Sequence, residues 1–304
     1  MLMVKKIKIG RRFAKWLRSL FNTSFDNRFE AFVQSLFEIE GLKEILSDVS
    51  RGMLTAFQIR TIIELTTLKS NLLNKYIPDA VQSANSVKKA AKSSKYRQYF
   101  LKVNFDDSVH EVIRLGYVNI FHKLEGFRDE LIALVNERGR ELFNKDVDIA
   151  AYLIRVHKFE IGHPKNYPET IRRIQWICNC VKHYGGYPKK KNPPDTCKGM
   201  DMTKKIELPK EDLERDIDFL IEFTTRLFLC ATLALGCVRL EEIFDNSDPA
   251  TKDKLLPSIA LIMTIAVVYL HSLQDEENDN FAAKWESFIV GWADLQKRKS
   301  PAKS

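Results

Sequence analysis

The residues best suited to chemistry lie on one segment, residues 172–183. At about 100° per residue of an α-helix, Arg172, Asn179 and His183 fall on one face of it. Histidine titrates near neutral pH, so His183 can move the 2′-hydroxyl proton of RNA while a cation or an amide holds the scissile phosphate. We therefore treat His183 as a candidate general acid/base, Asn179 as an orienting group, and Arg172 and Lys182 as candidate phosphate ligands. The alternative is that His183 caps a helix end and Asn179 is an ordinary surface residue.

An amphipathic helix is needed to position this polar face. Apolar side chains repeat with helical spacing on another side of the segment, and the glycine pair 185–186 followed by Pro188 ends the helix. The residues of this apolar stripe are Ile171, Ile174, Ile177, Cys178 and Val181. The pattern predicts a helix with one face in a core and the other face at the surface.

A lysine-rich loop follows the segment. Residues 182–210 carry eight Lys/Arg and three acids, and residues 1–18 carry seven Lys/Arg and no acid. The two stretches therefore sum to +5 and +7, which exceeds the net charge of +8, so the remainder is net acidic. Clustered positive charge favours a polyanionic partner, either nucleic acid or an anionic membrane surface, although a solubilising face has the same composition. The candidate RNA-binding residues are Lys182, Lys189, Lys190 and Lys191.

Several other kinds of site are excluded by the sequence. It has no Gly-rich phosphate loop, no Gly-x-Ser-x-Gly elbow and no His-Glu-x-x-His motif. On a helix Cys178 and Cys180 point about 160° apart, so they cannot bind one metal ion, and Cys180, His183 and Cys197 would lack a fourth ligand. We therefore predict neither a metal nor a cofactor. The five cysteines, odd in number and mostly in apolar contexts, favour reduced thiols and a cytoplasmic location.

Composition and periodicity predict an all-α protein. The chain of 304 residues is 45% hydrophobic and 29% charged, and its 12 Gly and 10 Pro leave long stretches uninterrupted. Segment 78–105 is either a surface helix or a domain-joining segment. Charged residues at the edge of the 106–143 stripe, such as Arg114, are expected to extend to solvent, and the alternative is a buried catalytic ion pair. Apolar stripes predict helices at about 11–22, 24–46, 53–76, 106–143 and 281–295. Runs that are apolar on all sides predict helices at about 209–244 and 255–270, and a shorter helix is predicted at 146–160.

Two features raise the question of a membrane. The apolar runs at 227–238 and 255–270 are shorter than the roughly 20 residues that span a bilayer, so we expect core helices there. The basic amphipathic helix at 11–22 is expected to pack on the core, and the alternative is docking on a membrane surface or a partner through residues 1–22.

The run Cys178-Asn179-Cys180-Val181-Lys182-His183 resembles the signature of the HEPN superfamily. Members are small all-helical bundles, frequent in prokaryotic toxin–antitoxin and antiviral-defence systems, and many are metal-independent RNases. The signature is an Arg, four to six further residues and a His, commonly with Asn directly after the Arg. The resemblance covers about residues 105–245, and it implies an RNA endonuclease, a homodimer through the motif helix and an antitoxin or defence-system partner protein.

Cys178 stands where the family has its arginine, and a thiol cannot replace a guanidinium there. Either Arg172 substitutes for it, for example across a dimer, or the domain is degenerate and binds RNA or a partner protein as a sensor or scaffold. Three regions are predicted: an N-terminal helical region (1–104), an HEPN-like bundle (105–245), and a C-terminal helical hairpin with a basic tail (246–304).

Overall fold

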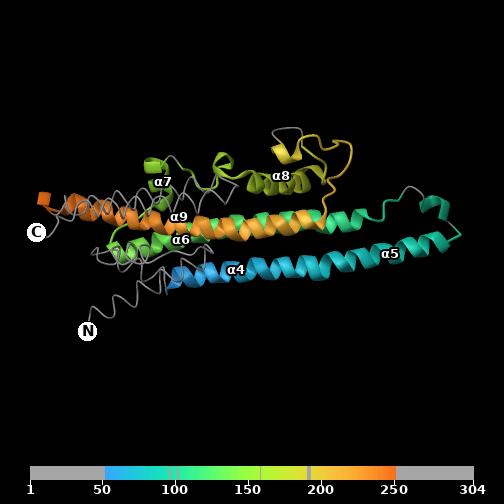
Figure 1. Ribbon diagram of the computed structural model, residues 1–304, viewed down its shortest axis with the longest axis horizontal. Helices are drawn as coiled ribbons and strands as arrows, with labels where there is room; N and C mark the ends of the chain where they lie inside the picture. Colours follow the sequence, from blue (N-terminus) through green and yellow to red (C-terminus); the bar gives the residue numbers. More distant parts are fainter. Residues whose placement is uncertain (1–51, 96, 101–102, 158, 190–192, 251–304) are drawn as a thin grey trace, which may run out of the picture. The chain divides into compact units, whose positions relative to one another are not determined.

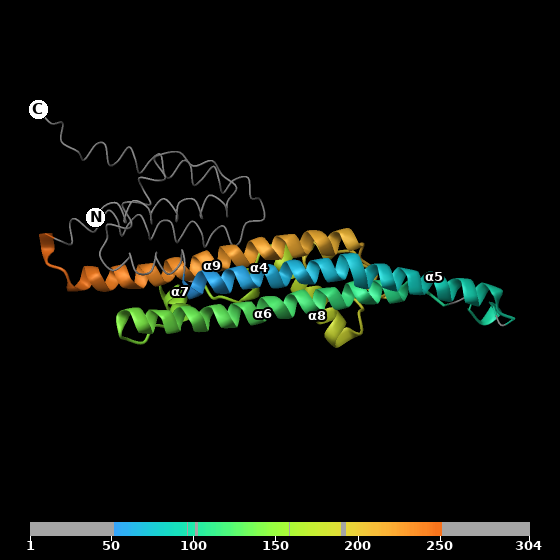
Figure 2. The same ribbon diagram turned by 90° about the horizontal axis from the view of Figure 1, so that it is seen from below.

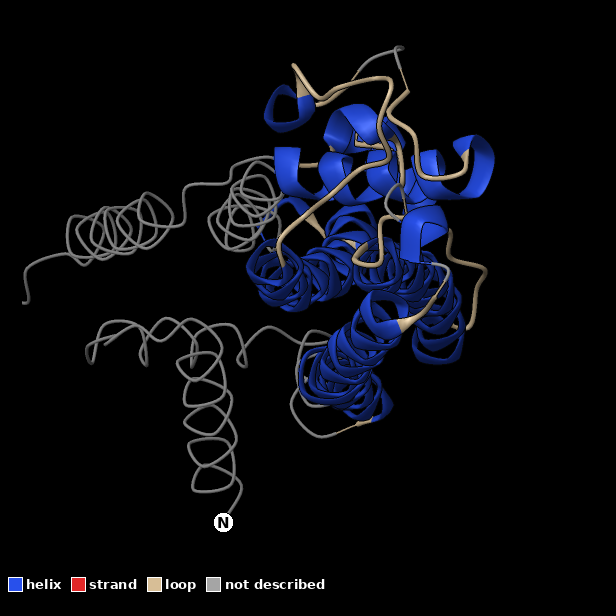
Figure 3. Cartoon of the chain, turned by 90° about the vertical axis from the view of Figure 1, so that its right-hand side faces the viewer, coloured by secondary structure: helices blue, strands red, loops and turns tan. Residues whose placement is uncertain are grey.

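The computed structural model describes residues 52–95, 97–100, 103–157, 159–189 and 193–250 (Figure 1). This part of the chain is 79% helical and contains no strand, which confirms the all-α prediction (Figure 3). The helices predicted at 11–22, 24–46, 255–270 and 281–295, and the basic tail, lie outside the described residues.

Helix α4 (Met53–Asn71) continues without a break into α5 (Ile77–Ser93) through a π-helical turn, η1 (Leu72–Tyr76) (Figure 2). The buried side chains of α5 are Ile77, Ala84 and Ala91, spaced by seven residues, and most of its other side chains are exposed. Of the two alternatives for segment 78–105, the surface helix is therefore the one found over most of it.

The remaining helices lie close to their predicted bounds. They are α6 (Asp107–Phe143), α7 (Ile149–His157), α8 (Glu169–Tyr184) and α9 (Lys210–Asn246), with short 3₁₀ turns η2 (Arg97–Phe100), η3 (Pro164–Asn166) and η4 (Asp195–Cys197). The helices α6 and α8 were predicted from apolar stripes of helical period, because burying such a stripe drives an amphipathic segment to fold as a helix. For α9 the prediction came from Pro209, the acids of its first turn and an interior that is apolar on all sides.

The chain divides into two compact units whose boundaries fall inside α4, α6 and α9 and between η3 and α8. Unit 2 comprises residues 60–128 and 167–224 and contains α8 with its lysine-rich loop. The described part of unit 1 comprises residues 52–59, 129–157, 159–166 and 225–250. This division differs from the three regions drawn from the sequence, which remain a prediction.

In unit 1 the core is built on the apolar part of α9. Most of its side chains between 227 and 237 are buried, as expected for a core helix. The Tyr152 hydroxyl of α7 donates a hydrogen bond to Glu241 of α9 (3.0 Å). Among the described residues, no helix is both long enough and apolar enough to cross a membrane.

In unit 2, α6 packs against α4 and α9. Ile113, Ile120 and Leu124 are buried along the predicted stripe of α6. A β-carbon added at Gly116 would lie 2.9 Å from Leu213 of α9 and 3.6 Å from Leu72, so the glycine allows these elements to approach closely. The prediction that Arg114 extends to solvent is wrong, because only 1% of this residue is exposed and it is held by ion pairs.

Two glycines within α6 should respond oppositely to alanine. At Gly126 an added β-carbon meets nothing within 4 Å, so Gly126→Ala should raise the free energy of unfolding by about 0.5–1 kcal/mol through helix propensity. At Gly139 it would lie 2.9 Å from both Leu235 and Val147, so Gly139→Ala should lower that free energy by about 1–3 kcal/mol. Urea unfolding followed by circular dichroism measures both, and equal signs would contradict the packing described at Gly139.

Candidate nucleic-acid interface

Helix α8 places the predicted polar face at the surface of unit 2. Arg172 and His183 are exposed and Asn179 is half-buried. On the other side of the helix, Ile171, Ile174 and Ile177 are fully buried and Val181 is half-buried. The predicted amphipathic helix is therefore confirmed, with its histidine in the last turn.

Cys178 belongs to the buried face. Its exposed fraction is 0%, and burial raises the pKa of its thiol to about 11. A protonated thiol in the core neither reaches a ligand on the polar face nor binds a phosphate. The position at which the HEPN signature has its arginine therefore contributes only packing in this chain.

Arg172 is separated from His183 along the helix. Its guanidinium forms an ion pair with Glu169 one turn earlier, with an N–O distance of 2.5 Å. Eleven residues of helix rise place the Arg172 and His183 backbones about 16 Å apart. Within one chain the structure therefore brings Asn179 and Lys182 near His183, and leaves Arg172 on the same face but engaged elsewhere.

Two tyrosines that the motif analysis did not select stand beside His183. Gly185 has a φ of 61°, and the amide of Gly186 donates to the Cys180 carbonyl (3.0 Å), which closes α8 with a glycine cap. Tyr184 and Tyr187, on either side of the glycine pair, are 45% and 43% exposed. The Nζ of Lys189 lies 5.6 Å from the centroid of the Tyr184 ring.

We call the group formed by Lys182, His183, Tyr184, Tyr187 and Lys189 the α8 C-terminal surface. The sequence signal for it was Tyr-Gly-Gly-Tyr-Pro, in which aromatic residues flank a turn and two lysines stand close by. Cations beside exposed aromatic rings are the combination that binds phosphates and stacks on unpaired bases.

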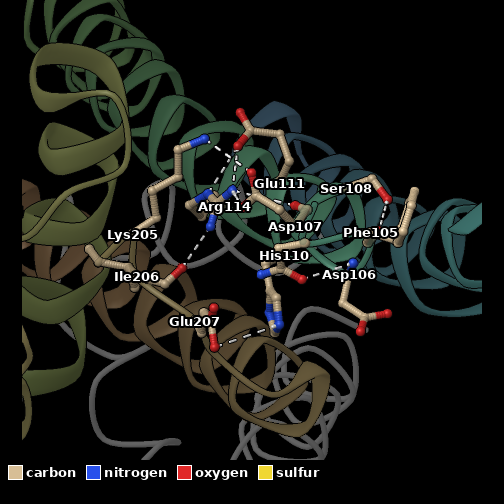
Figure 4. A network of polar contacts seen from close by, with 11 residues as sticks. Phe105, Asp106, Asp107, Ser108, His110, Glu111, Arg114, Lys205, Ile206 and Glu207 are labelled. Carbon is tan, nitrogen blue, oxygen red and sulfur yellow. Dashed lines mark hydrogen bonds and ion pairs between the residues drawn. The ribbon is translucent and has the colours of Figure 1, made fainter. Parts of the chain in front are cut away.

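A buried arginine holds the lysine-rich loop at its base (Figure 4). The Ile206 amide donates to the Gly186 carbonyl (2.8 Å), so the two ends of the loop meet. Arg114 donates through NH1 to the Ile206 carbonyl (2.9 Å) and through NH2 to Asp107 (2.7 Å) and Glu111 (2.6 Å). The loop is thus closed on the first turns of α6, and its start, at Tyr187 and Lys189, is held next to His183.

Between residues 184 and 208, all of the described lysines except Lys189 form ion pairs with carboxylates. Lys198 pairs with Asp195 (2.5 Å), Lys204 with Asp201 (3.8 Å) and Lys205 with Asp107 (3.1 Å). Within the described ranges no carboxylate forms an ion pair with Lys182 or Lys189, while Lys190 and Lys191 lie outside those ranges. Among the described lysines between residues 182 and 205, the two left unpaired therefore both belong to the α8 C-terminal surface.

The base of the loop should be sensitive to acid. Hydrogen bonds from Arg114 and Lys205 hold the pKa of Asp107 below its ordinary value of 3.8. A lowered carboxyl pKa contributes stability that is fully present above the unfolded value and is lost as the pH falls through the folded value. We expect the protection factor of the Ile206 amide against hydrogen exchange, which is the observed rate normalised to the intrinsic rate at each pH, to fall below about pH 4 in the wild type, and less steeply in Asp107→Asn. Identical pH profiles for the two proteins would contradict this role of Asp107.

A second buried network fixes α8 to the unit 2 core. The Arg173 guanidinium donates to Oδ1 of Asp216 on α9, and the Tyr117 hydroxyl of α6 donates to Oδ2 (2.9 Å). Asp216 and Tyr117 are fully buried, and burial raises the pKa of both. Sequence analysis missed this network, although an arginine and an aspartate on otherwise apolar stripes signal buried partners. The network orients α8, and so the surface at its C-terminal end.

Among the described residues, no group of three or more His, Cys, Asp or Glu side chains could hold a metal ion. Comparisons with protein-family models, with curated proteins and with solved structures gave no match. A function for this chain is therefore argued from the α8 C-terminal surface itself.

Proposed function

We propose that this protein binds RNA through the α8 C-terminal surface. The observation that carries the proposal is the position of Lys182 and Lys189, whose charges no described carboxylate matches, beside exposed Tyr184 and Tyr187. The lysines would neutralise phosphates and the rings would stack on bases, and neither interaction requires a metal. The resemblance to HEPN proteins of prokaryotic defence and toxin systems supports RNA as the polyanion.

RNA cleavage by His183 is the second candidate function. It is favoured by one observation: His183 is exposed, next to Lys182 and one turn from Asn179 on the same face. His183 would take the 2′-hydroxyl proton, Asn179 would orient the backbone and Lys182 would hold the phosphate. Arg172 could join them only from a second copy of the chain, because its own histidine is about 16 Å away along the helix.

Binding is tested with a fluorescein-labelled RNA oligonucleotide by anisotropy over a range of salt concentrations. The double variant Lys182→Ala/Lys189→Ala should weaken binding about tenfold. It should also make the slope of log affinity against log salt concentration less negative by about 1.4, the value for two lost phosphate contacts on a single strand. The matched control is Lys198→Ala/Lys204→Ala, which removes two paired lysines from the same loop and should change affinity less than twofold. Equal losses in both variants would contradict an interface at the α8 C-terminal surface.

Cleavage is tested on the same RNA in the presence of a chelator. His183→Ala should abolish cleavage while it leaves the affinity for RNA within about threefold, since the lysines and tyrosines remain. Mixing Arg172→Ala with His183→Ala protein should restore part of the activity if a site forms across a dimer. Equal cleavage by the wild type and His183→Ala would remove this second function and leave the binding proposal standing.

A further inference from the structure

A groove runs along α5 on unit 2, and it shares no residue with the α8 C-terminal surface. Its volume is about 680 Å³. Leu73, Ile77, Pro78 and Val81 form its apolar part, neutral polar side chains of α5 continue it, and Lys89 and Lys210 also line it. Residues from Leu73 to Lys89 extend over sixteen residues of helix, which corresponds to about 24 Å.

The apolar part of the groove has the geometry of a helix-packing surface. Leu73, Ile77 and Val81 recur every four residues, the spacing of the side-chain rows that pack against a second helix. Ile77 is buried with 3% of its surface exposed, Leu73 is half-buried, and Val81 (42% exposed) and Pro78 are exposed, so the groove opens to solvent mainly around Pro78 and Val81. A groove of this length leaves one side of any small molecule in water, whereas a helix would cover it with one face and keep its own polar face in solvent.

The charge at the two ends is positive and unmatched. Within the described part of the chain, no carboxylate forms an ion pair with Lys89 or Lys210, whereas the neighbouring Lys88 pairs with Asp106 at 2.6 Å. Lys210 begins α9, and Leu213 one turn later approaches Leu72 at Gly116, which places Lys210 near the Leu73 end. Lys89 lies eight residues beyond Val81, so the apolar row has a lysine toward each end.

We propose that this groove binds an acidic amphipathic helix of a partner protein. Such a helix carries an apolar stripe that covers the exposed parts of Leu73, Pro78 and Val81, and Asp or Glu residues near its ends that pair with Lys89 and Lys210. The α5 helix of a second copy fits the groove less well, because it presents Lys88, Lys89 and Lys92 against a single acid, Asp79. Pairing of α5 with α5 therefore does not supply the complementary charge.

The test uses full-length protein and two fluorescein-labelled 18-residue helical peptides. Both peptides have leucines at every third and fourth position, and the other positions are mainly glutamate in one peptide and lysine in the other. The glutamate peptide should bind saturably in an anisotropy titration, and Val81→Asp should weaken that binding about tenfold or more. Lys89→Glu/Lys210→Glu should weaken it similarly and should transfer the preference to the lysine peptide.

Matched controls lie on the same helix outside the groove. Val87→Asp and Lys92→Glu alter a 50% exposed valine and an exposed lysine of α5, and both should leave the affinity within twofold. The proposal is overturned if the glutamate peptide does not saturate, if both peptides bind wild type equally, or if the controls weaken binding as much as Val81→Asp. Two other results would also overturn the proposal, because they would assign the groove to another occupant. One is saturable binding of dodecanoate without binding of the glutamate peptide, and the other is self-association of the wild type that is lost in Val81→Asp.

Discussion

Replacing Asp216 by alanine should lower the free energy of unfolding by about 3–5 kcal/mol, the largest single loss that we expect in unit 2. Asp216 is fully buried between Arg173 and Tyr117. Its removal leaves the Arg173 guanidinium in the core without its counter-charge and the Tyr117 hydroxyl without its acceptor. A buried charge that loses its partner costs far more than a hydrogen bond lost at the surface.

Two companion variants make the expectation specific. Tyr117→Phe removes one donor while Asp216 keeps Arg173, so it should cost only about 1 kcal/mol. The double variant Arg173→Met/Asp216→Leu replaces both charges with apolar side chains of similar volume, and it should be more stable than Asp216→Ala. Chemical denaturation followed by circular dichroism measures all three proteins. An Asp216→Ala protein within 1 kcal/mol of the wild type would show that the network does not hold α8 in place.

Arg114→Met should lower the free energy of unfolding by about 2–3 kcal/mol and release the lysine-rich loop. The expected loss is smaller than for Asp216 because Asp107 and Glu111 are partly exposed and water can solvate them once Arg114 is gone. The Ile206 carbonyl loses its buried donor, so amide exchange across residues 187–206 should quicken. RNA affinity should fall as well, since Tyr187 and Lys189 are no longer held beside His183. Unchanged exchange in the loop would contradict the role given to Arg114.

The glycine pair after α8 supplies a matched comparison for the same site. Both glycines have positive φ, 61° for Gly185 and 87° for Gly186. A β-carbon at Gly185 meets nothing within 4 Å, but one at Gly186 lies 3.1 Å from Cδ of Arg114. Gly185→Ala should therefore cost about 1 kcal/mol of backbone strain, and Gly186→Ala should cost more because it also displaces Arg114. The reverse order would mean that Arg114 does not pack under the turn.

Much of the helical architecture could be read from local pattern. The apolar stripes of α6 and α8 repeat with helical period, and the Gly185–Gly186 pair stops α8 where the chain must turn. Burial of such a stripe is the main force that forms these helices, so their type and approximate bounds follow from the spacing of apolar residues. The α5 segment was ambiguous because its many Lys, Ser and Ala residues offer little apolar surface, and its buried side chains are Ile77, Ala84 and Ala91, of which two are small.

The buried polar groups could not be predicted from pattern. Arg114 bonds to Ile206 92 residues away, Tyr117 to Asp216 99 residues away, and Arg173 to Asp216 43 residues away. A charged side chain is stable in a core only if such a partner meets it there. Periodicity records which face of a helix a residue occupies, and it carries no information on what the opposing helix presents.

The same distinction applies to the candidate site. From the sequence alone came the polar face of α8, with Asn179 and His183, and the count of lysines in the loop that follows. Tertiary structure decided that Cys178 faces the core, that Arg172 is engaged by Glu169, and which loop lysines are paired with carboxylates. The physical reason is that the charge available to a partner is what remains after a protein's own ion pairs have formed, and those pairs exist only once the chain has folded.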